Sequence, residues 1–441
     1  MPFTPLPIAA EYRRLAVTAK ADIRDGNASV FLTLALCLVV PFGGVGIVAA
    51  MSLMSIAASR GKLLVEALKL YAGPWLKSDA FALNLLILLV TLVEAGLVFY
   101  HGDDPGDLEN QIKQYVMALA ILLTIRRFPA GAVLWGAAAG CFLGGLMALS
   151  DLFLIGLDRA DGPTNAIRFG MLAALLSVFC LIGAVFGRPA KLTRIVMAVA
   201  TCAGIVAVFA SGSRGAVLAV PAMLLLLVPR LWRNSRMTAM LAGLVFLLFS
   251  VALGIWQVSL IRSDLSNLMQ AADAMVTGGD VEERSAHNRM EMLKLAAELF
   301  AAHPVAGVGA HGWDEAVAAQ MRNSPPETAL DEAFNQPHNQ FANDFAKGGL
   351  LRGVGGLAMI FFPLFLFLRR RPFRSGPESI APLLGATTCV AYFVFCLTES
   401  VMDLSLTASI YAVLIFYLIA SSEGAPLSTP DAERRAAHAA G

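Results

Sequence analysis

The sequence predicts an all-α integral membrane protein with about 12 transmembrane helices and one large, partly helical periplasmic loop. Hydrophobic residues make up 57% of the 441 residues and charged residues only 15%, against roughly 25% charged in an ordinary soluble domain. Apolar runs comparable to the roughly 20 residues that cross a bilayer recur from Ser29 to Ala420. Basic residues collect in alternate loops between these runs. Together these observations indicate one polytopic domain rather than several soluble ones.

Hydropathy places the individual spans. The twelve predicted spans cover residues 29–40, 43–58, 80–100, 112–125, 131–155, 166–187, 193–210, 215–229, 237–257, 350–368, 379–398 and 404–421. The first two and the eighth are short, and Pro41 with the glycines that follow could make 29–58 a bent pair of helices. We therefore assign residues 1–421 to one polytopic transmembrane domain.

The distribution of charge predicts the orientation. Lys and Arg in short loops are retained on the cytoplasmic side, and 22 of the 33 basic residues fall in loops or tails on one side of the predicted bundle. Both termini are therefore expected to be cytoplasmic. Residues 422–441 form a short polar tail that we expect to be disordered. The net charge of +1 provides no general attraction for nucleic acid.

Residues 258–348 form a large periplasmic loop between the ninth and tenth predicted spans. This loop holds thirteen acidic residues, six basic residues and four of the six histidines. So long a connection without structure of its own is uncommon, so function or an ordered subdomain is expected. Residues 282–302 have apolar positions at helical spacing and end before His303 and Pro304, which predicts an amphipathic helix.

The motif SGSRGA at 211–216 interrupts the apolar region between the seventh and eighth spans. An arginine near hydrocarbon costs about 2.5–3.5 kcal/mol at the centre of a span, so Arg214 needs a partner or a water-filled cavity. The small neighbours, with Ser211 and Ser213 in supporting positions, leave backbone amides open to an anion. The alternative is an ordinary turn with an arginine that extends to the interface.

Two further arginines lie on or just before the predicted amphipathic helix. A guanidinium binds phosphate through two parallel hydrogen bonds, so Arg284 and Arg289 are candidate diphosphate ligands. The alternative is a solvated helical face on which the arginines pair with Glu291 or Glu298. The motif GVGAHG that follows at 307–312 lacks the strand and helix of a dinucleotide site, so we interpret it as a glycine-rich turn that allows close packing.

His338 lies just before an apolar run enters the membrane, with Asn339 beside it. An imidazole that accepts a proton near neutral pH could act there as a general base toward a hydroxyl. A structural role for a lone histidine is the common alternative.

The spacing of the other loop histidines predicts no metal site. The acidic run from Asp103 to Asp107 contains Pro105 and Gly106, so it predicts a turn rather than a helix that presents carboxylates to magnesium.

In order along the chain, these motifs resemble the O-antigen ligase family. The resemblance is carried by SGSRGA with Arg214, by RMEMLKLAAELFAAHPVAGVG with Arg289 and by HNQF with His338, and it extends to the architecture over roughly residues 29–421. The wider group of membrane glycosyltransferases includes O-antigen polymerases and protein O-oligosaccharyltransferases. Family members commonly have tryptophan where this chain has Leu293. Their histidine motif tends to close with G-x-x-G, whereas here Gly349 is followed by three other residues and the next glycine is Gly353.

The resemblance implies a metal-independent, inverting transfer without a cofactor. Polysaccharide would pass from undecaprenyl diphosphate to a sugar hydroxyl of lipid A-core in a multi-pass protein of the bacterial inner membrane, with the active site facing the periplasm and lipid tails lying between spans. It implies that Arg214 and Arg289, with Arg284 as a third, bind the diphosphate and that His338 orients or deprotonates the acceptor.

Other functions stay open. A polymerase of the same group would use an acceptor linked to undecaprenyl diphosphate, and a protein oligosaccharyltransferase would use a serine or threonine. A secondary transporter is the alternative from another class. Transporters place charged sites near the bilayer midplane, often in repeated halves. The sequence indicates neither internal symmetry nor a convincing mid-span charge pair.

Overall fold

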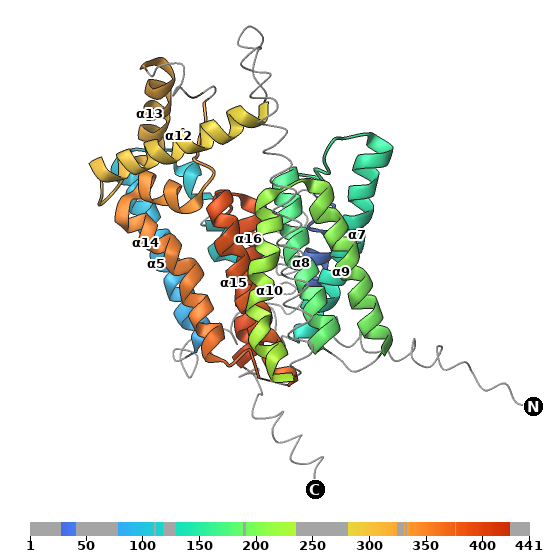
Figure 1. Cartoon of the computed structure of the whole chain (residues 1–441). Coiled ribbons are helices and arrows are strands. Elements are labelled where there is room, and N and C mark those ends of the chain that lie inside the picture. Colours follow the sequence, from blue (N-terminus) through green and yellow to red (C-terminus); the bar gives the residue numbers. More distant parts are fainter. Residues whose placement is uncertain are drawn as a thin grey trace, which may run out of the picture.

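The computed structural model describes a helical protein (Figure 1). The described residues are 28–40, 78–109, 112–117, 129–187, 191–234, 281–323, 330, 333–374 and 376–423. Within these ranges every regular element is a helix and there is no strand. The predicted all-α class is therefore correct for the described part of the chain.

Eight described helices are long and apolar enough to cross a membrane, which makes this a multi-pass membrane protein. They are α5 (Asp79–His101), α7 (Ala130–Leu149) continued by the π-helix η3 (Ser150–Ile155), α8 (Ala166–Phe186), α9 (Lys191–Ser211), α10 (Arg214–Asn234), α14 (Gln340–Arg369), α15 (Ile380–Thr398) and α16 (Ser405–Glu423). Each corresponds to a span that hydropathy predicts.

The other four predicted spans are described in part or not at all. The span at 29–40 contains α2 (Ala28–Leu36), a helix of nine residues. Only residues 112–117 of the span at 112–125 are described, and they are helical. The spans at 43–58 and 237–257 lie outside the described residues, as does the tail from 424 onward. The count of twelve and the periplasmic location of the 258–348 loop therefore remain predictions.

One boundary is wrong. The tenth predicted span begins at 350, but α14 begins ten residues earlier at Gln340, inside the segment that the sequence assigns to the loop. Gly349 has φ +58 and ψ −151, which breaks the helix into two parts. The polar residues before Gly349 hid this first part from hydropathy. The short part presents its polar side chains at the end of the bundle, and the longer part forms the span.

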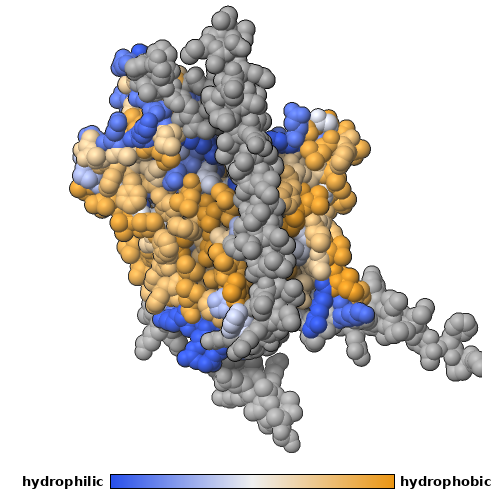
Figure 2. Space-filling view, viewed as in Figure 1, coloured by the Kyte–Doolittle hydropathy of each residue, from blue (hydrophilic) through white to orange (hydrophobic). Residues whose placement is uncertain are grey.

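The bundle has an apolar belt with polar residues at both ends (Figure 2). At one end Asp79 pairs with Arg369 and Arg370, which joins the start of α5 to the end of α14. At the opposite end α12 (Val281–Ala302) lies across the bundle, with α13 (Gly309–Asn323) beyond it (Figure 1). The predicted amphipathic helix at 282–302 is thus confirmed, including its end before His303.

Small residues let the spans approach closely. A Cβ added to Gly140 in α7 would lie 2.3 Å from the Leu34 carbonyl oxygen of α2, and one on Gly204 in α9 would lie 2.2 Å from Ser177 Oγ of α8. Close backbone approach at small residues is a main source of helix association in lipid, where no hydrophobic driving force acts between helices. These contacts set the positions of α8 and α9, and therefore of the turn that leads into α10.

A second close contact fixes α12 and α13 to α14. The turn between them contains Gly307 at φ +67, and a Cβ there would lie 2.4 Å from the Lys347 carbonyl carbon. Backbone hydrogen bonds join the same segments, from Leu350 N to the Pro304 oxygen at 2.8 Å and from Val308 N to the Ala346 oxygen at 3.1 Å. The glycine-rich turn is therefore a packing element, as its sequence predicts.

Candidate functional site

The structure brings Arg214, Arg289 and His338 to the same end of the bundle. Arg214 is the first residue of α10, Arg289 lies in α12, and His338 is two residues before α14. These elements meet at the end where α12 crosses the bundle (Figure 1). Glu399, at the end of α15, links them: it contacts His338 directly and acts electrostatically on Arg289, which is in turn affected by the charge of Arg214.

The 211–214 turn presents Arg214. Gly212 has φ +61, a left-handed conformation that favours glycine, and its N–H donates to the Phe209 oxygen at 3.0 Å. Ser211 is fully buried, and its hydroxyl donates to the Val208 oxygen at 2.7 Å and accepts from Ser213 N at 3.2 Å. The two serines therefore shape the turn, while the Arg214 side chain is exposed at the start of α10.

A third cation, Arg159, lies against the same turn. Its Nε donates to the Ser211 carbonyl oxygen at 2.9 Å, and a Cβ on Gly212 would approach that nitrogen to 3.1 Å. The backbone of the neighbouring Ala160 donates to the Ala210 oxygen at 2.9 Å. The loop between η3 and α8 thus packs on the SGSRG turn. Arg159 was not predicted as a site residue, because nothing in its local sequence connects it with the SGSRG turn 52 residues away.

Arg289 is half-buried in a charged environment. Burial lowers the pKa of its guanidinium from the ordinary value, the Glu399 carboxylate opposes this shift, and the positive charge of Arg214 lowers the pKa further. An arginine nevertheless keeps its charge. Two like charges are therefore close enough to repel each other, and an anion placed between them would relieve that repulsion.

His338 is held by Glu399. The imidazole Nδ1 lies 3.1 Å from each of the two Glu399 carboxylate oxygens. The Glu399 carboxylate also accepts hydrogen bonds from Gln336 Nε2 at 3.1 Å and from Ser400 N at 3.0 Å. Because an ionised carboxylate only accepts hydrogen bonds, Nδ1 donates to Glu399, and in the neutral form of the ring Nε2 keeps its lone pair.

The electrostatics of Glu399 agree with this arrangement. Its side chain is buried, which by itself would raise its pKa, but the hydrogen bond and charge of His338 outweigh burial, helped by Ser400 N and Arg289. The pKa of Glu399 is therefore lowered, and the carboxylate stays ionised at neutral pH. A fixed carboxylate behind an imidazole stabilises the protonated ring, which is the state that a general base reaches in the transition state.

The backbone at His338 is strained. Its φ is +50, one of two positive values among non-glycine residues in the described part of the chain. A residue in this region costs of order 1–3 kcal/mol and persists where its surroundings determine it. Here Asn339 begins α14, its Oδ1 accepting from Ala342 N at 3.0 Å and its Nδ2 donating to the Leu397 oxygen at 3.2 Å. Asn339 and Glu399 therefore hold His338 in place from both sides.

The third predicted arginine, Arg284, lies in α12, but its side chain is outside the described residues. Its predicted role therefore stays a prediction. Among the side chains that the structure describes, no group of three or more His, Cys, Asp or Glu has the arrangement of a metal site.

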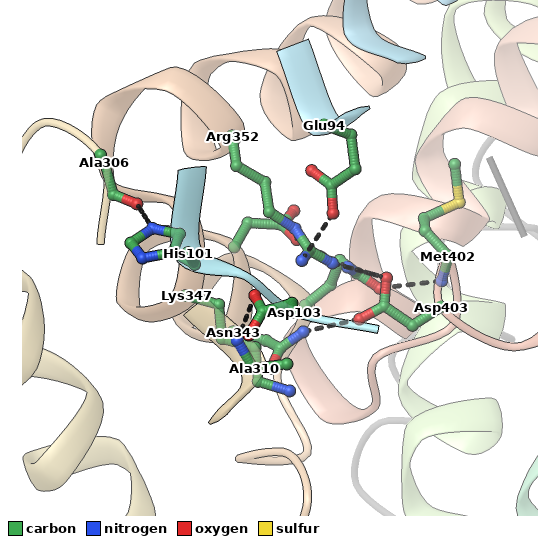
Figure 3. A network of polar contacts seen from close by, with 12 residues as sticks. Glu94, His101, Asp103, Ala306, Ala310, Asn343, Lys347, Arg352, Met402 and Asp403 are labelled. Carbon is green, nitrogen blue, oxygen red and sulfur yellow. Dashed lines mark hydrogen bonds and ion pairs between the residues drawn. The ribbon is translucent and has the colours of Figure 1, made fainter. Parts of the chain in front are cut away.

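A buried polar network adjoins this site (Figure 3). Arg352 in α14 forms ion pairs with Glu94 of α5 at 2.8 Å, with Asp344 at 2.9 Å and with Asp403 at 2.9 Å. Gln340 Nε2 donates to Asp344 at 2.9 Å, and Asn343 Nδ2 donates to Asp403 at 2.6 Å. Glu94 and Arg352 thus pair between α5 and α14, toward the end of the bundle where α12 lies. The charges are paired, so the network has a structural task.

The acidic run at 103–107 leads into a single turn of 3₁₀ helix, η2 (Pro105–Leu108), rather than an α-helix. Asp104 accepts from Gly106 N at 2.8 Å within the turn. Asp103 accepts from Ala310 N at 2.9 Å and from His311 N at 3.0 Å, so it caps the start of α13 from a distant part of the chain. A carboxylate at a helix N-terminus satisfies backbone donors that have no partner inside the helix.

Sequence reasoning missed Glu399, Gln336 and Arg352. Glu399 ends a predicted span in the segment ESVMDL, and a carboxylate at such a boundary needs a partner. That rule could have paired it with the histidine predicted on the same face. Arg352 lies between Gly349 and Gly353, and nothing in its local sequence indicates its three partners.

Comparisons with known proteins support these motifs. Residues 197–357 match the family described as O-antigen ligase, a segment that includes Arg214, Arg289 and His338. An uncharacterized protein of Haemophilus influenzae is 21% identical over 326 residues, which cover 69% of this chain and 76% of that protein. The family resemblance stated from the motifs is therefore confirmed over the matched segment.

Proposed function

We propose that this protein, which carries an O-antigen ligase family domain at residues 197–357, transfers polysaccharide from undecaprenyl diphosphate to a sugar hydroxyl of lipid A-core. We place it in the bacterial inner membrane, with its site facing the periplasm. The observation that carries the proposal is the juxtaposition of a carboxylate-held histidine with two neighbouring arginines at one end of a membrane bundle. The family match supports a ligase or polymerase type of transfer.

In the proposed reaction the arginines bind the leaving group. Breaking the bond between the anomeric carbon and the diphosphate oxygen increases negative charge on that oxygen. Arg214 and Arg289 supply fixed positive charge there, and their mutual repulsion in the free protein falls when the diphosphate lies between them. Arg159, which is hydrogen-bonded to the same turn, contributes positive charge nearby.

His338 acts on the acceptor. Its Nε2 takes the proton of the acceptor hydroxyl while the oxygen attacks the anomeric carbon, and undecaprenyl diphosphate leaves from the opposite face. The resulting imidazolium is stabilised through its Nδ1–H by Glu399. One carbon–oxygen bond forms and one breaks, with inversion at the anomeric carbon. The scheme uses no metal, so EDTA is expected to leave the rate of the purified enzyme unchanged.

The decisive experiment is transfer by purified protein reconstituted with lipid-linked polysaccharide and lipid A-core. We expect His338→Asn to lower the rate by about 10²–10⁴-fold, the usual contribution of a general base. Asparagine is chosen because it tolerates positive φ better than alanine, so the backbone at 338 should be retained. A rate near that of wild type would remove His338 from the mechanism.

The acceptor separates the proposal from its close alternatives. In a deletion strain, loss of a ligase leaves full-length polymer on the lipid carrier, whereas loss of a polymerase leaves single repeat units; mass spectrometry distinguishes them. Transfer to a protein serine or threonine would appear as lost protein glycosylation. Polymer of unchanged length still attached to lipid A-core would contradict the ligase proposal.

A secondary transporter is less well supported. The charged network around Arg352 is paired within itself and lies toward the same end of the bundle as Arg214, Arg289 and His338. Transporter sites, in contrast, lie near the midplane. Vesicles that move polysaccharide across the membrane without forming a glycosidic bond would favour the transporter.

A further inference from the structure

A small hydrophobic core, separate from the core of the bundle, joins α12, α13 and the first part of α14. Its buried members are Met292, Leu295, Ala296, Trp313, Val317, Leu330 and Ala346. Trp313 of α13 is the largest of these side chains and is fully buried. Phe334, four residues before His338, packs against the same core. The core is therefore in contact with the segment that carries the proposed base.

The Trp313 indole is hydrogen-bonded to this segment. Its Nε1–H donates to the Phe334 carbonyl oxygen at 2.9 Å. Lys347 Nζ donates to the carbonyl oxygen of the next residue, Asn335, at 2.7 Å, and lies 5.9 Å from the centre of the Trp313 ring. Neither carbonyl belongs to a helix, so side-chain donors supply the partners that regular structure would provide. The backbone is thus fixed at two consecutive residues before it reaches His338.

Phe334 transmits this constraint to the imidazole. The Phe334 and His338 rings meet edge to face, with centroids 5.9 Å apart and planes at 75°. The imidazole Nδ1 is at the same time within hydrogen-bond distance of Glu399. The φ of +50 at His338 is a conformation that persists where the surroundings enforce it. The phenyl ring and the carboxylate together therefore favour one orientation of the imidazole.

We propose that Trp313 is a positioning residue for His338. Its indole N–H fixes the backbone at Phe334, and the Phe334 ring then holds the imidazole against Glu399. Trp313 is fully buried, so it acts through these groups and touches no substrate. The inference rests on the proposed function, in which His338 is the general base. A misplacement of about 1 Å in such a group lowers the rate by about 10²-fold.

Trp313→Phe tests this role with little disturbance of the core. It removes the indole N–H and keeps an aromatic ring in place. A larger truncation would also displace α12, because Met292, three residues after Arg289, is fully buried in the same core. The matched control is Trp135→Phe, which replaces a partly buried indole of α7 that packs against the core of the bundle.

Steady-state transfer with purified full-length protein gives the first measurement. We expect Trp313→Phe to lower kcat by about 10–10²-fold, with donor and acceptor KM close to those of wild type. The acid limb of the kcat profile should move to lower pH, because an imidazole displaced from the Glu399 carboxylate loses stabilisation of its protonated form. Trp135→Phe should change neither quantity. A wild-type kcat and pH profile in Trp313→Phe would overturn the proposal.

A double-mutant cycle with Glu399→Gln separates positioning from a purely structural role. Once the carboxylate is gone, Trp313→Phe should lower kcat much less than it does in wild type, because both changes act on the same contact. The rate is expressed per folded protein, measured by thermal unfolding in detergent. Losses that simply multiply in the double variant would overturn the proposal.

Phe334→Leu is the second variant, for the case in which Trp313→Phe does not fold. It removes the ring beside His338 and keeps the backbone carbonyl that Trp313 uses, so it should lower kcat and move the acid limb in the same direction. An unchanged pH profile in this variant would overturn the proposal. If wild type transfers nothing to lipid A-core, the proposed function itself fails, so the two failures are distinguishable.

Discussion

Arg352 and Arg289 lie at the same end of the molecule and differ in what surrounds them. Arg352 is paired with three carboxylates within 2.9 Å, on two helices and a loop. Arg289 has a single carboxylate, Glu399, as its main opposite charge and a second arginine as a like charge. Among the described groups, the Arg352 guanidinium is therefore surrounded by opposite charge, whereas Arg289 experiences one carboxylate and one like charge. The same side chain can therefore fix the fold in one place and bind an anion in another.

The strongest test of this difference is the removal of Arg352. Arg352→Met leaves Glu94, Asp344 and Asp403 without their common counter-ion, and removing one partner of a buried ion pair destabilises by about 3–5 kcal/mol. We expect little folded protein and a clearly lower melting temperature in detergent. Arg322→Met, at an exposed position in α13, is the control. A variant as stable as wild type would show that the network does not hold α5 and α14 together.

Arg289→Gln, in contrast to Arg352→Met, should lower the transfer rate rather than the stability. We expect the melting temperature to stay close to that of wild type, or to rise because a repulsion with Arg214 is lost. The transfer rate should fall by about 10²–10³-fold, as for removal of one group that stabilises charge in a transition state. Lysine should restore only part of the rate, because it cannot bind the diphosphate through two parallel bonds. Strong destabilisation without a specific loss of rate would assign Arg289 to the fold instead.

Glu399→Gln tests the carboxylate between the two regions through pH. The amide stabilises the imidazolium less, so kcat should fall on the order of 10²-fold and the acid limb of the pH profile should move to lower pH. Because the folded pKa of Glu399 is lowered, its contribution to stability is present above the unfolded pKa and is lost as pH falls through the folded one. The variant should therefore lose less stability than wild type on acidification. Parallel pH profiles of activity would contradict the pairing with His338.

The smallest effect is expected at Asp103. Asp103→Ala removes the side chain that accepts from the first N–H groups of α13, and loss of such a cap costs about 0.5–2 kcal/mol. The melting temperature should drop slightly and the transfer rate should remain near wild type, with or without added magnesium. A large loss of rate that magnesium restores would show that this carboxylate holds a metal after all.

Much of the fold could be predicted from the sequence because lipid imposes simple rules. Eight predicted spans coincide with described helices, since each needs a long apolar run whose backbone bonds are internal. The start of α14 could not be predicted from hydropathy, because residues 340–348 include several polar side chains and pack against the turn at 304–308. Tertiary contacts there override hydropathy.

The site was predictable to a smaller extent. Arg214, Arg289 and His338 lie in local motifs, and this is why the sequence could propose them as site residues. Glu399 is 61 residues from His338, and Asp403 is 51 residues from Arg352. Partners at such separations are chosen by the packing of α14 against α15, which no local pattern encodes. The partners decide the chemistry, since they distinguish a paired arginine from one that attracts an anion.

The seam between the Pro304 turn and α14 has a consequence for how the protein can vary. It is made by backbone N–H and carbonyl groups and by glycines without side chains, so it places few demands on the residues around it. Surface residues of α12 and α13 can therefore change without disturbing this seam, which keeps α12 and α13 against α14. The glycines at 307 and 349 are the points that permit such variation.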